Sequence, residues 1–201
     1  MAVKNENRAE TAGTQPRKRL STRFRMMSPA CVSSPMPLFL LLLSYLSVFS
    51  AGSPVAQRAT VYVFLADTCP ISQAATLPLR ELYGQYAGQG VRFVGVFPAA
   101  ATTPAALADF AKTYQLPFAL QADPGHRLTR RLHAHVTPEV VVLGPDGRTT
   151  LYQGRLNDAY AGLGQHRPIT RHHELADALA DVAAGRAVAV PRTEPVGCFI
   201  E

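Results

Sequence analysis

Outside its first 50 residues the chain carries almost no net charge, although its formal charge is +6. Those 50 residues hold seven of the 20 lysines and arginines but only two of the 14 acidic residues, which leaves 13 basic and 12 acidic side chains for the rest. A surface that binds nucleic acid or anionic lipid needs a basic patch on the folded part of the chain. The charge pattern excludes such a surface, and we expect no nucleic-acid partner.

Internal repeats and low-complexity tracts are also absent. A chain of 201 residues with 47% hydrophobic residues is long enough for one domain with a substantial core. We expect a leader at residues 1–52, the domain at residues 57–187 and a C-terminal tail at residues 188–201.

Cysteine is scarce, and no two of the three cysteines stand at Cys-x-x-Cys spacing. In the stretch FLADTCPISQAATLP, residues 64–78, the residue three positions after Cys69 is Ser72. A dithiol within this stretch is therefore excluded. If Cys69 forms a mixed disulfide, another group must resolve it.

Paired metal-binding motifs are missing as well. The six histidines include no His-x-x-His pair, and a copper or zinc site built on Cys69 would need further soft ligands. His133 and His135 are interpreted as a helix-end cap and a surface residue. We assign no metal ligand, and copper handling is kept only as an alternative function.

The leader has the pattern of a signal peptide. The basic segment RKRLSTRFRMM precedes a twelve-residue apolar block, LFLLLLSYLSVF at 38–49, which is short for a membrane span. Small residues then favour cleavage after Ser50 or Gly52. The sequence predicts a periplasmic or secreted protein, and an uncleaved membrane anchor is the alternative.

Strand-like and helix-like segments alternate from Ala59 onward. Short runs of β-branched and aromatic residues predict strands, and helical spacing of apolar residues predicts helices. The expected strands are 59–66, 91–99, 116–123, 139–144 and 149–154, and the expected helices are 72–90, 102–115, 124–134 and 171–185. Asp146 and Gly147 supply a turn between the last two strands. The pattern predicts an α/β fold with a central mixed sheet, first parallel and then an antiparallel hairpin, flanked by helices.

Cys69 stands between an expected buried strand and an expected helix that begins at or near Pro70. Unpaired backbone N–H groups and the helix dipole at such a position lower the pKa of a thiol and favour the nucleophilic thiolate. Cys69 is therefore a candidate reactive thiol. A buried, inert cysteine is the alternative.

Pro138 stands directly before the β-branched run of residues 139–144. Proline cannot donate a hydrogen bond within a sheet, so it marks a strand start or an edge, and a cis Thr137-Pro138 bond would explain its place. With Cys-Pro-Ile-Ser at a helix start, these features resemble the thioredoxin-like superfamily. Within it the chain is most similar to the redoxin branch, which includes the alkyl hydroperoxide reductase/thiol-specific antioxidant group and exported thiol-disulfide oxidoreductases. The resemblance covers about residues 57–187.

The resemblance implies roles for four residues. Cys69 would be the attacking thiol, with cis Pro138 against it and the backbone of Thr137 holding an extended segment of the partner. Ser72 occupies the second position of the motif, where its hydroxyl can bind the thiolate but cannot expel a partner. The implied partners are protein or small-molecule thiols and disulfides, including a membrane-associated redox protein, and no organic cofactor is implied.

Other functions of the same fold stay open. Peroxidases of this group place an activating threonine three residues before the cysteine, where this chain has Ala66, while Thr68 is in a different register. Thiol peroxidase activity is therefore an alternative, as is a redox-inactive binding module.

The tail ends in PVGCFIE and carries the remaining thiol, Cys198. Because this segment is apolar, we expect it to pack back on the domain. Export would remove Cys31, leaving Cys69 and Cys198 in a compartment where disulfides persist. The tail is long enough to reach Cys69, and exported redoxin-like proteins end in a similar Gly-Cys motif after a segment like GRLNDAY. We expect Cys198 to resolve or pair with Cys69; an unpaired packing residue is the alternative.

The loop at 154–168 is longer than the connection requires. Arg155, Asn157, Asp158 and Tyr160 could line a binding edge. A loop that packs on itself is the alternative.

Overall fold

The computed structural model describes residues 56–201, so the predicted leader and its cleavage sites lie outside the described residues. The elements in chain order are β1 (Ala59–Phe64), α2 (Pro70–Tyr86), η2 (Ala87–Gln89), β2 (Val91–Phe97), α3 (Pro104–Thr113), β3 (Ala119–Ala122), α4 (Arg127–Leu132), β4 (Val136–Thr137), β5 (Glu139–Leu143), β6 (Thr150–Gly154), β7 (Tyr160–Gly162), β8 (Gln165–His166), α5 (Glu174–Ala183) and β9 (Cys198–Phe199).

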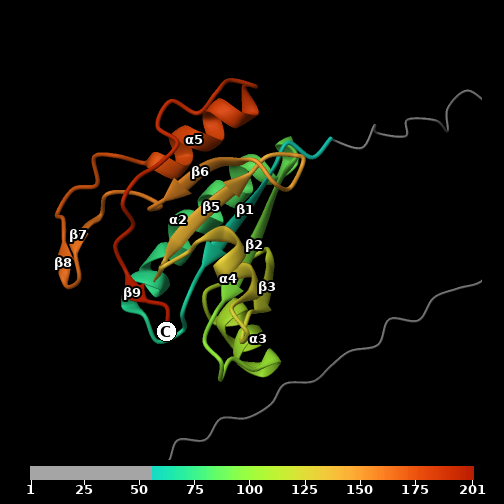
Figure 1. Ribbon diagram of the computed structural model, residues 1–201. Coiled ribbons are helices and arrows are strands. Elements are labelled where there is room, and N and C mark those ends of the chain that lie inside the picture. Colours follow the sequence, from blue (N-terminus) through green and yellow to red (C-terminus); the bar gives the residue numbers. More distant parts are fainter. Residues whose placement is uncertain (1–55) are drawn as a thin grey trace, which may run out of the picture. The chain divides into compact units, whose positions relative to one another are not determined.

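A five-stranded mixed sheet forms the centre, with strand order β3-β2-β1-β5-β6 (Figure 1). β1 pairs in parallel with β2, and β2 in parallel with β3. β5 runs antiparallel to both β1 and β6. The predicted α/β architecture, with a parallel first part and a closing antiparallel hairpin, is confirmed.

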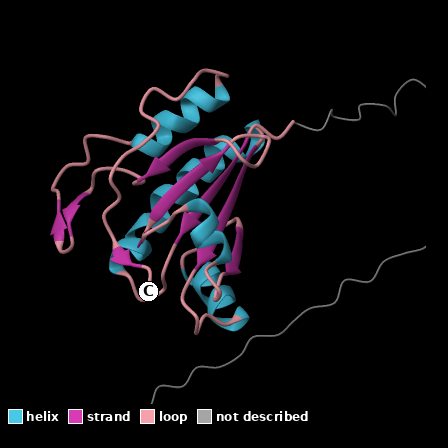
Figure 2. Cartoon of the chain, viewed as in Figure 1, coloured by secondary structure: helices cyan, strands magenta, loops and turns pink. Residues whose placement is uncertain are grey.

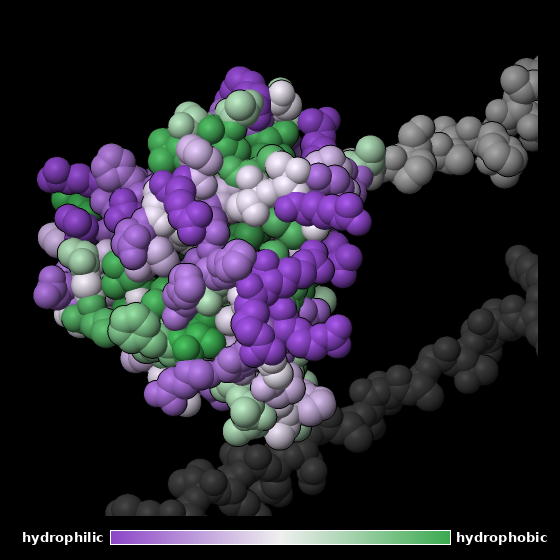
Figure 3. All heavy atoms as spheres, viewed as in Figure 1, coloured by the Kyte–Doolittle hydropathy of each residue, from purple (hydrophilic) through white to green (hydrophobic). Residues whose placement is uncertain are grey.

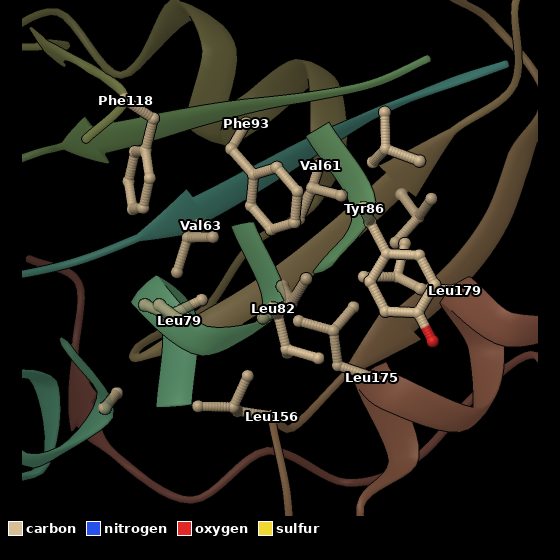
Figure 4. Packing of buried hydrophobic residues seen from close by; sticks show 14 of the residues in the cluster. Val61, Val63, Leu79, Leu82, Tyr86, Phe93, Phe118, Leu156, Leu175 and Leu179 are labelled. Atoms are coloured by element: carbon tan, nitrogen blue, oxygen red, sulfur yellow. The ribbon is translucent and has the colours of Figure 1, made fainter. Parts of the chain in front are cut away.

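Side chains alternate between the two faces of the sheet, and helices cover both. On one face Val61 and Val63 of β1 belong to the larger hydrophobic cluster, which includes buried residues of α2 and α5 (Figure 4). On the other face Phe64 belongs to a smaller cluster with Leu132 at the end of α4. Because both faces are buried, β1 and β5 are apolar along almost their whole length.

α2 continues through Pro78 and ends at Tyr86. Proline inside a helix removes one backbone hydrogen bond, so packing must hold the helix together there. Leu79, directly after it, is fully buried in the larger cluster, and Figure 4 shows it pointing toward Val63 and Leu82. The packed face of α2 keeps its first turn, which begins at Pro70, fixed against the sheet.

Four short strands lie outside the central sheet and were not expected from the sequence. β7 and β8 form a small antiparallel hairpin within the long loop, visible away from the main sheet in Figure 2. β9, in the C-terminal tail, pairs antiparallel with β4. The expected return of the apolar tail to the domain is confirmed by this pairing.

The tail follows β6 before it reaches β4. Gln153 receives a backbone hydrogen bond from Thr193 at 3.0 Å and donates one to Pro191 at 2.9 Å. The hydroxyl of Tyr152, a fully buried residue, donates to the carbonyl of Arg155 at 2.6 Å and lies 2.7 Å from Thr193 Oγ1. These contacts anchor the tail before its last eight residues.

No helix within residues 56–201 combines the length and apolar character needed to span a membrane.

Replacing Tyr152 with phenylalanine tests this anchor. The Tyr152→Phe protein keeps the ring but loses both hydroxyl contacts, which should lower the free energy of unfolding by about 1–2 kcal/mol. Denaturant unfolding of the full chain measures the change. Tyr62→Phe is the matched control, because the structure records no hydrogen bond from the Tyr62 hydroxyl to residues 56–201, and equal losses in the two variants would contradict the anchor.

Candidate functional site: a pair of thiols beside a cis proline

Cys69 is the N-cap residue of α2, with Pro70 at the first helical position. Its backbone is extended, at φ −90° and ψ 115°, and its carbonyl accepts a hydrogen bond from the N–H of Gln73 at 3.0 Å. The thiol therefore lies at the positive end of the helix, as the sequence predicted. The residue is buried, with 2% of its surface exposed.

Cys198 lies directly against Cys69. Its thiol donates toward Cys69 Sγ over an S–S distance of 2.9 Å, although 129 positions separate the two residues. The register of the β4–β9 pair places Cys198 opposite Thr137. Both thiols are free. They are the only two cysteines within residues 56–201, so each is the thiol with which the other could form a disulfide.

The Thr137-Pro138 bond is cis, as predicted, and this segment borders the thiol pair. Cys69 Sγ lies 3.2 Å from the carbonyl oxygen of Thr137, to which the thiol can donate. The hydroxyl of Thr137 makes a long hydrogen bond, 3.5 Å, to the carbonyl of Cys198. The structure thus brings four predicted site residues together: Cys69, Thr137, Pro138 and Cys198.

Ser72, the fifth predicted site residue, is fully buried beneath Cys69. Its hydroxyl accepts a hydrogen bond from the N–H of Ala66 at 3.2 Å, which ties the loop before Cys69 to the first turn of α2. Its hydroxyl and its backbone N–H also lower the pKa of the Cys69 thiol. Ser72 therefore shapes the loop and stabilises a thiolate without being able to form a disulfide.

The pKa values of the two thiols move in opposite directions. Burial by itself raises the pKa of Cys69, but hydrogen bonds from the Cys198 thiol, from Ser72 and from the Cys198 backbone outweigh it, so that the pKa lies below its usual value. The hydrogen bond to Cys69, together with burial and the charge of Cys69, raises the pKa of Cys198 to about 11. Of the two thiols, Cys69 is therefore the more acidic one, and Cys198 is the one that donates to it.

Glu139, which sequence reasoning missed, holds the segment before the cis proline. It is 2% exposed, and its carboxylate accepts hydrogen bonds from the backbone N–H groups of His135 at 2.7 Å and Val136 at 3.3 Å. The amide of Gln153 donates to the same carboxylate at 2.8 Å. One signal in the sequence could have identified Glu139: an acidic residue begins an otherwise apolar strand. A carboxylate buried in such a strand must find hydrogen-bond donors.

A hollow of about 550 Å³ opens beside the two thiols. Its lining combines Thr68 and Cys69, the turn after β2, Thr137 and the last residues of the tail, Cys198 to the C-terminus. Figure 3 shows apolar side chains gathered where the tail ends, beside a strongly polar surface over α4. Both thiols therefore lie in the wall of one hollow.

A second cavity, about 200 Å³, has Pro138 and Val196 in its lining. Three of the four predicted loop residues line it: Arg155, Asn157 and Tyr160. Arg155 is also bound to the carboxylate of Glu174, with an Nε–Oε1 distance of 2.7 Å.

Asp158, the fourth predicted loop residue, points into the loop itself. It is 4% exposed and accepts hydrogen bonds from the backbone N–H groups of Arg171 at 2.8 Å and His172 at 3.0 Å. These hydrogen bonds, above all that from His172, outweigh burial and hold its pKa below the usual value. Asp158 therefore closes the loop on itself, whereas its three neighbours form a cavity wall.

The two histidines that precede the cis proline, His133 and His135, lie at a helix end and on the surface. His133 is the C-cap residue of α4, as predicted, and both His133 and His135 are exposed. Within residues 56–201 no group of three or more histidine, cysteine and acidic side chains lies close enough together to hold a metal ion.

Comparison with known proteins agrees with this fold. An uncharacterized conserved protein from Geobacillus kaustophilus aligns at a TM-score of 0.65 and 24% identity, over 73% of this chain and 78% of that one. A hypothetical protein from Sinorhizobium meliloti aligns at a TM-score of 0.64 and 24% identity, over 72% and 80%. A thioredoxin-like protein solved in its oxidized form aligns at 0.50 and 16% identity, over 66% and 82%.

The fold is thioredoxin-like, as the resemblance implied. The model of the AhpC/TSA family matches residues 45–151, which is more than half of the chain, and the protein belongs to that family. No curated protein matches the chain. Cys69 and Pro138 fall within the matched residues, whereas Cys198 lies beyond them.

The opposite pKa shifts predict different alkylation profiles for the two thiols. The rate at Cys69 should rise through a midpoint below that of an ordinary cysteine, because its thiolate is stabilised, while the rate at Cys198 should reach its midpoint only near pH 11. Iodoacetamide labelling of the reduced protein, followed by peptide mass analysis, measures both. A common midpoint for the two thiols would show that they do not interact.

Ser72→Ala should raise the pKa of Cys69, because one hydrogen bond to the thiolate is lost while the backbone N–H is retained. The midpoint of the Cys69 alkylation profile measures the shift. Thr76→Ala is a suitable control, since Thr76 lies one turn further along α2 and donates only to the carbonyl of Gln73. An unchanged midpoint in Ser72→Ala would remove Ser72 from the site.

Proposed function

We propose that this protein is an exported thiol-disulfide oxidoreductase whose redox couple is Cys69 and Cys198. The observation that carries the proposal is the 2.9 Å contact between the two sulfur atoms, with the more acidic thiol, Cys69, on one side and the less acidic thiol, Cys198, on the other. A disulfide has an S–S length of about 2.05 Å, so a small approach of the tail is enough to form the bond.

The first step uses the thiolate of Cys69. It attacks one sulfur of a partner disulfide, forms a mixed disulfide with that sulfur, and releases the other as a thiolate. The charge on Cys69 disappears in this step, and with it the hydrogen bond and the repulsion that keep the pKa of Cys198 high.

In the second step Cys198, now more acidic, loses its proton and attacks Cys69 Sγ. The Cys69–Cys198 disulfide forms and the second sulfur of the partner leaves as a thiolate, so the partner disulfide is reduced to two thiols while the pair on this chain is oxidised. Ser72 cannot perform this step. The distant Cys198 therefore takes the role of the second cysteine of a dithiol motif.

The substrates are thiols and disulfides of proteins or small molecules. The backbone beside Pro138 would hold an extended segment of a protein partner, with Thr137 supplying the hydrogen-bonding edge. The leader supports a place outside the cytoplasm, where an electron donor or acceptor in the membrane could complete the cycle.

Mapping the disulfide tests the redox couple. Mild oxidation should join Cys69 to Cys198, which tryptic peptide mass analysis without reduction detects as a link between residues 59–80 and 193–201. Disulfide exchange with insulin should fall to the uncatalysed rate in Cys69→Ser, because the nucleophile is lost, and Cys198→Ser should instead accumulate mixed disulfides. If both thiols stay free under oxidising conditions, this mechanism is wrong.

A second candidate, thiol peroxidase, is favoured by membership of the AhpC/TSA family and by the hollow at Cys69. Peroxide would oxidise the Cys69 thiolate to a sulfenic acid, and Cys198 would displace water to form the same disulfide. Treating Cys198→Ser with stoichiometric peroxide should then produce a sulfenic acid at Cys69, whereas thiol exchange alone predicts slow and unselective oxidation.

A further inference from the structure

The C-terminal strand occupies the edge at which the proposed function places a protein partner. β9 pairs with β4, and the N–H of Ile200 donates to the carbonyl of His135 at 2.9 Å. With the tail in place, Cys69 and Thr137 are each 2% exposed. An extended segment of another protein can reach them only where the tail now lies.

Two hollows border the tail. The cavity that includes Pro138 and Val196 adjoins the tail before Cys198, and the hollow that includes Thr137 and Phe199 adjoins the tail from Cys198 onward. Unfilled space therefore remains beside the tail. Its β-pairing extends over only two residues of each strand, which is a small contact for a partner to replace.

Gly197 allows the tail to lie this close. A Cβ atom at this position would be 2.2 Å from the carbonyl oxygen of Thr137, 2.6 Å from its carbonyl carbon and 3.0 Å from the nitrogen of Pro138. All three are backbone atoms, held by the cis proline turn and by Glu139, and they cannot yield as a flexible side chain would. In this register only glycine can precede the cysteine that meets Cys69.

The residues after Cys198 differ in what they contact. Phe199 is 78% exposed, so its side chain contributes little to docking. Ile200 packs against the smaller hydrophobic cluster beneath α4. The tail therefore meets the domain through glycine, cysteine and an apolar residue two positions after the cysteine.

We propose that the β4 edge selects an extended partner segment of the pattern Gly-Cys-x-apolar, and that the chain's own tail is the resident occupant, which the partner must displace. The proposal rests on the proposed function and adds the partner's recognition sequence and a built-in competitor. A tethered tail has a high effective concentration, so only segments that match its register compete with it. A partner segment whose cysteine does not follow a glycine therefore cannot dock at the β4 edge in extended form and present its disulfide to Cys69.

Two synthetic peptides test the selectivity on the full-length Cys198→Ser protein. Both carry thionitrobenzoate on their cysteine, so that attack by Cys69 releases a coloured thiolate; one has the tail sequence TEPVGCFIE and the other TEPVACFIE. The glycine peptide should react about tenfold faster or more, because overlap with backbone atoms costs at least ~1.4 kcal/mol, which is a factor of ten. Equal rates would overturn the proposed selectivity.

A second arm tests the tail as competitor. Adding Gly197→Ala to the Cys198→Ser protein should displace the tail and raise the rate with the glycine peptide, whereas Gly84→Ala, where a Cβ meets no atom within 4 Å, should leave it unchanged. An unchanged rate in the Gly197→Ala protein would show that the tail does not compete. Absence of reaction with either peptide in every variant would instead contradict the proposed function, so the two failures are distinguishable.

Discussion

The backbone pairing of β9 with β4 is the contact on which the whole site depends. It brings Cys198 within 2.9 Å of Cys69, and the resulting hydrogen bond from the Cys198 thiol is the strongest influence lowering the pKa of Cys69 against the effect of burial. Without this pairing, Cys69 would be one thiol at a helix start and Cys198 one thiol on a tail. The pairing itself depends on the absence of a side chain at Gly197 and on the position of Thr137 beside the cis proline.

In the proposed mechanism, the work of a dithiol is divided between two distant segments. A Cys-x-x-Cys motif keeps both thiols on one helix turn, where the helix fixes their separation. Here the first turn of α2 holds Cys69 and Ser72, while the second thiol arrives on a strand anchored at β6 by Tyr152 and Thr193. Such a pair can separate when the tail leaves, which a dithiol on one helix turn cannot do.

Much of the fold followed from local patterns. The apolar runs at β1, β2 and β5 have the length and β-branched content of buried strands. Pro70 stands in the first turn of α2 and Thr103 caps α3, and such helix starts depend only on neighbouring residues. The position of Pro138 directly before a strand predicted the cis bond, because proline has a restricted φ angle and no N–H group to donate within a β-sheet. β4, β9 and the role of Glu139 were missed, because two-residue strands and buried hydrogen-bond partners leave no periodic signal and depend on segments far apart in the sequence.

The sequence by itself determined that Cys69 stands at a helix start without a second cysteine in its loop, since residue spacing along one helix turn decides this. It also determined that the apolar tail should return to the domain, because hydrophobic residues are buried where they can be. Only the tertiary structure decided where Cys198 lands, that Gly197 must be a glycine, and which loop residues face a cavity. These depend on contacts between backbone segments that approach each other only after the sheet has formed.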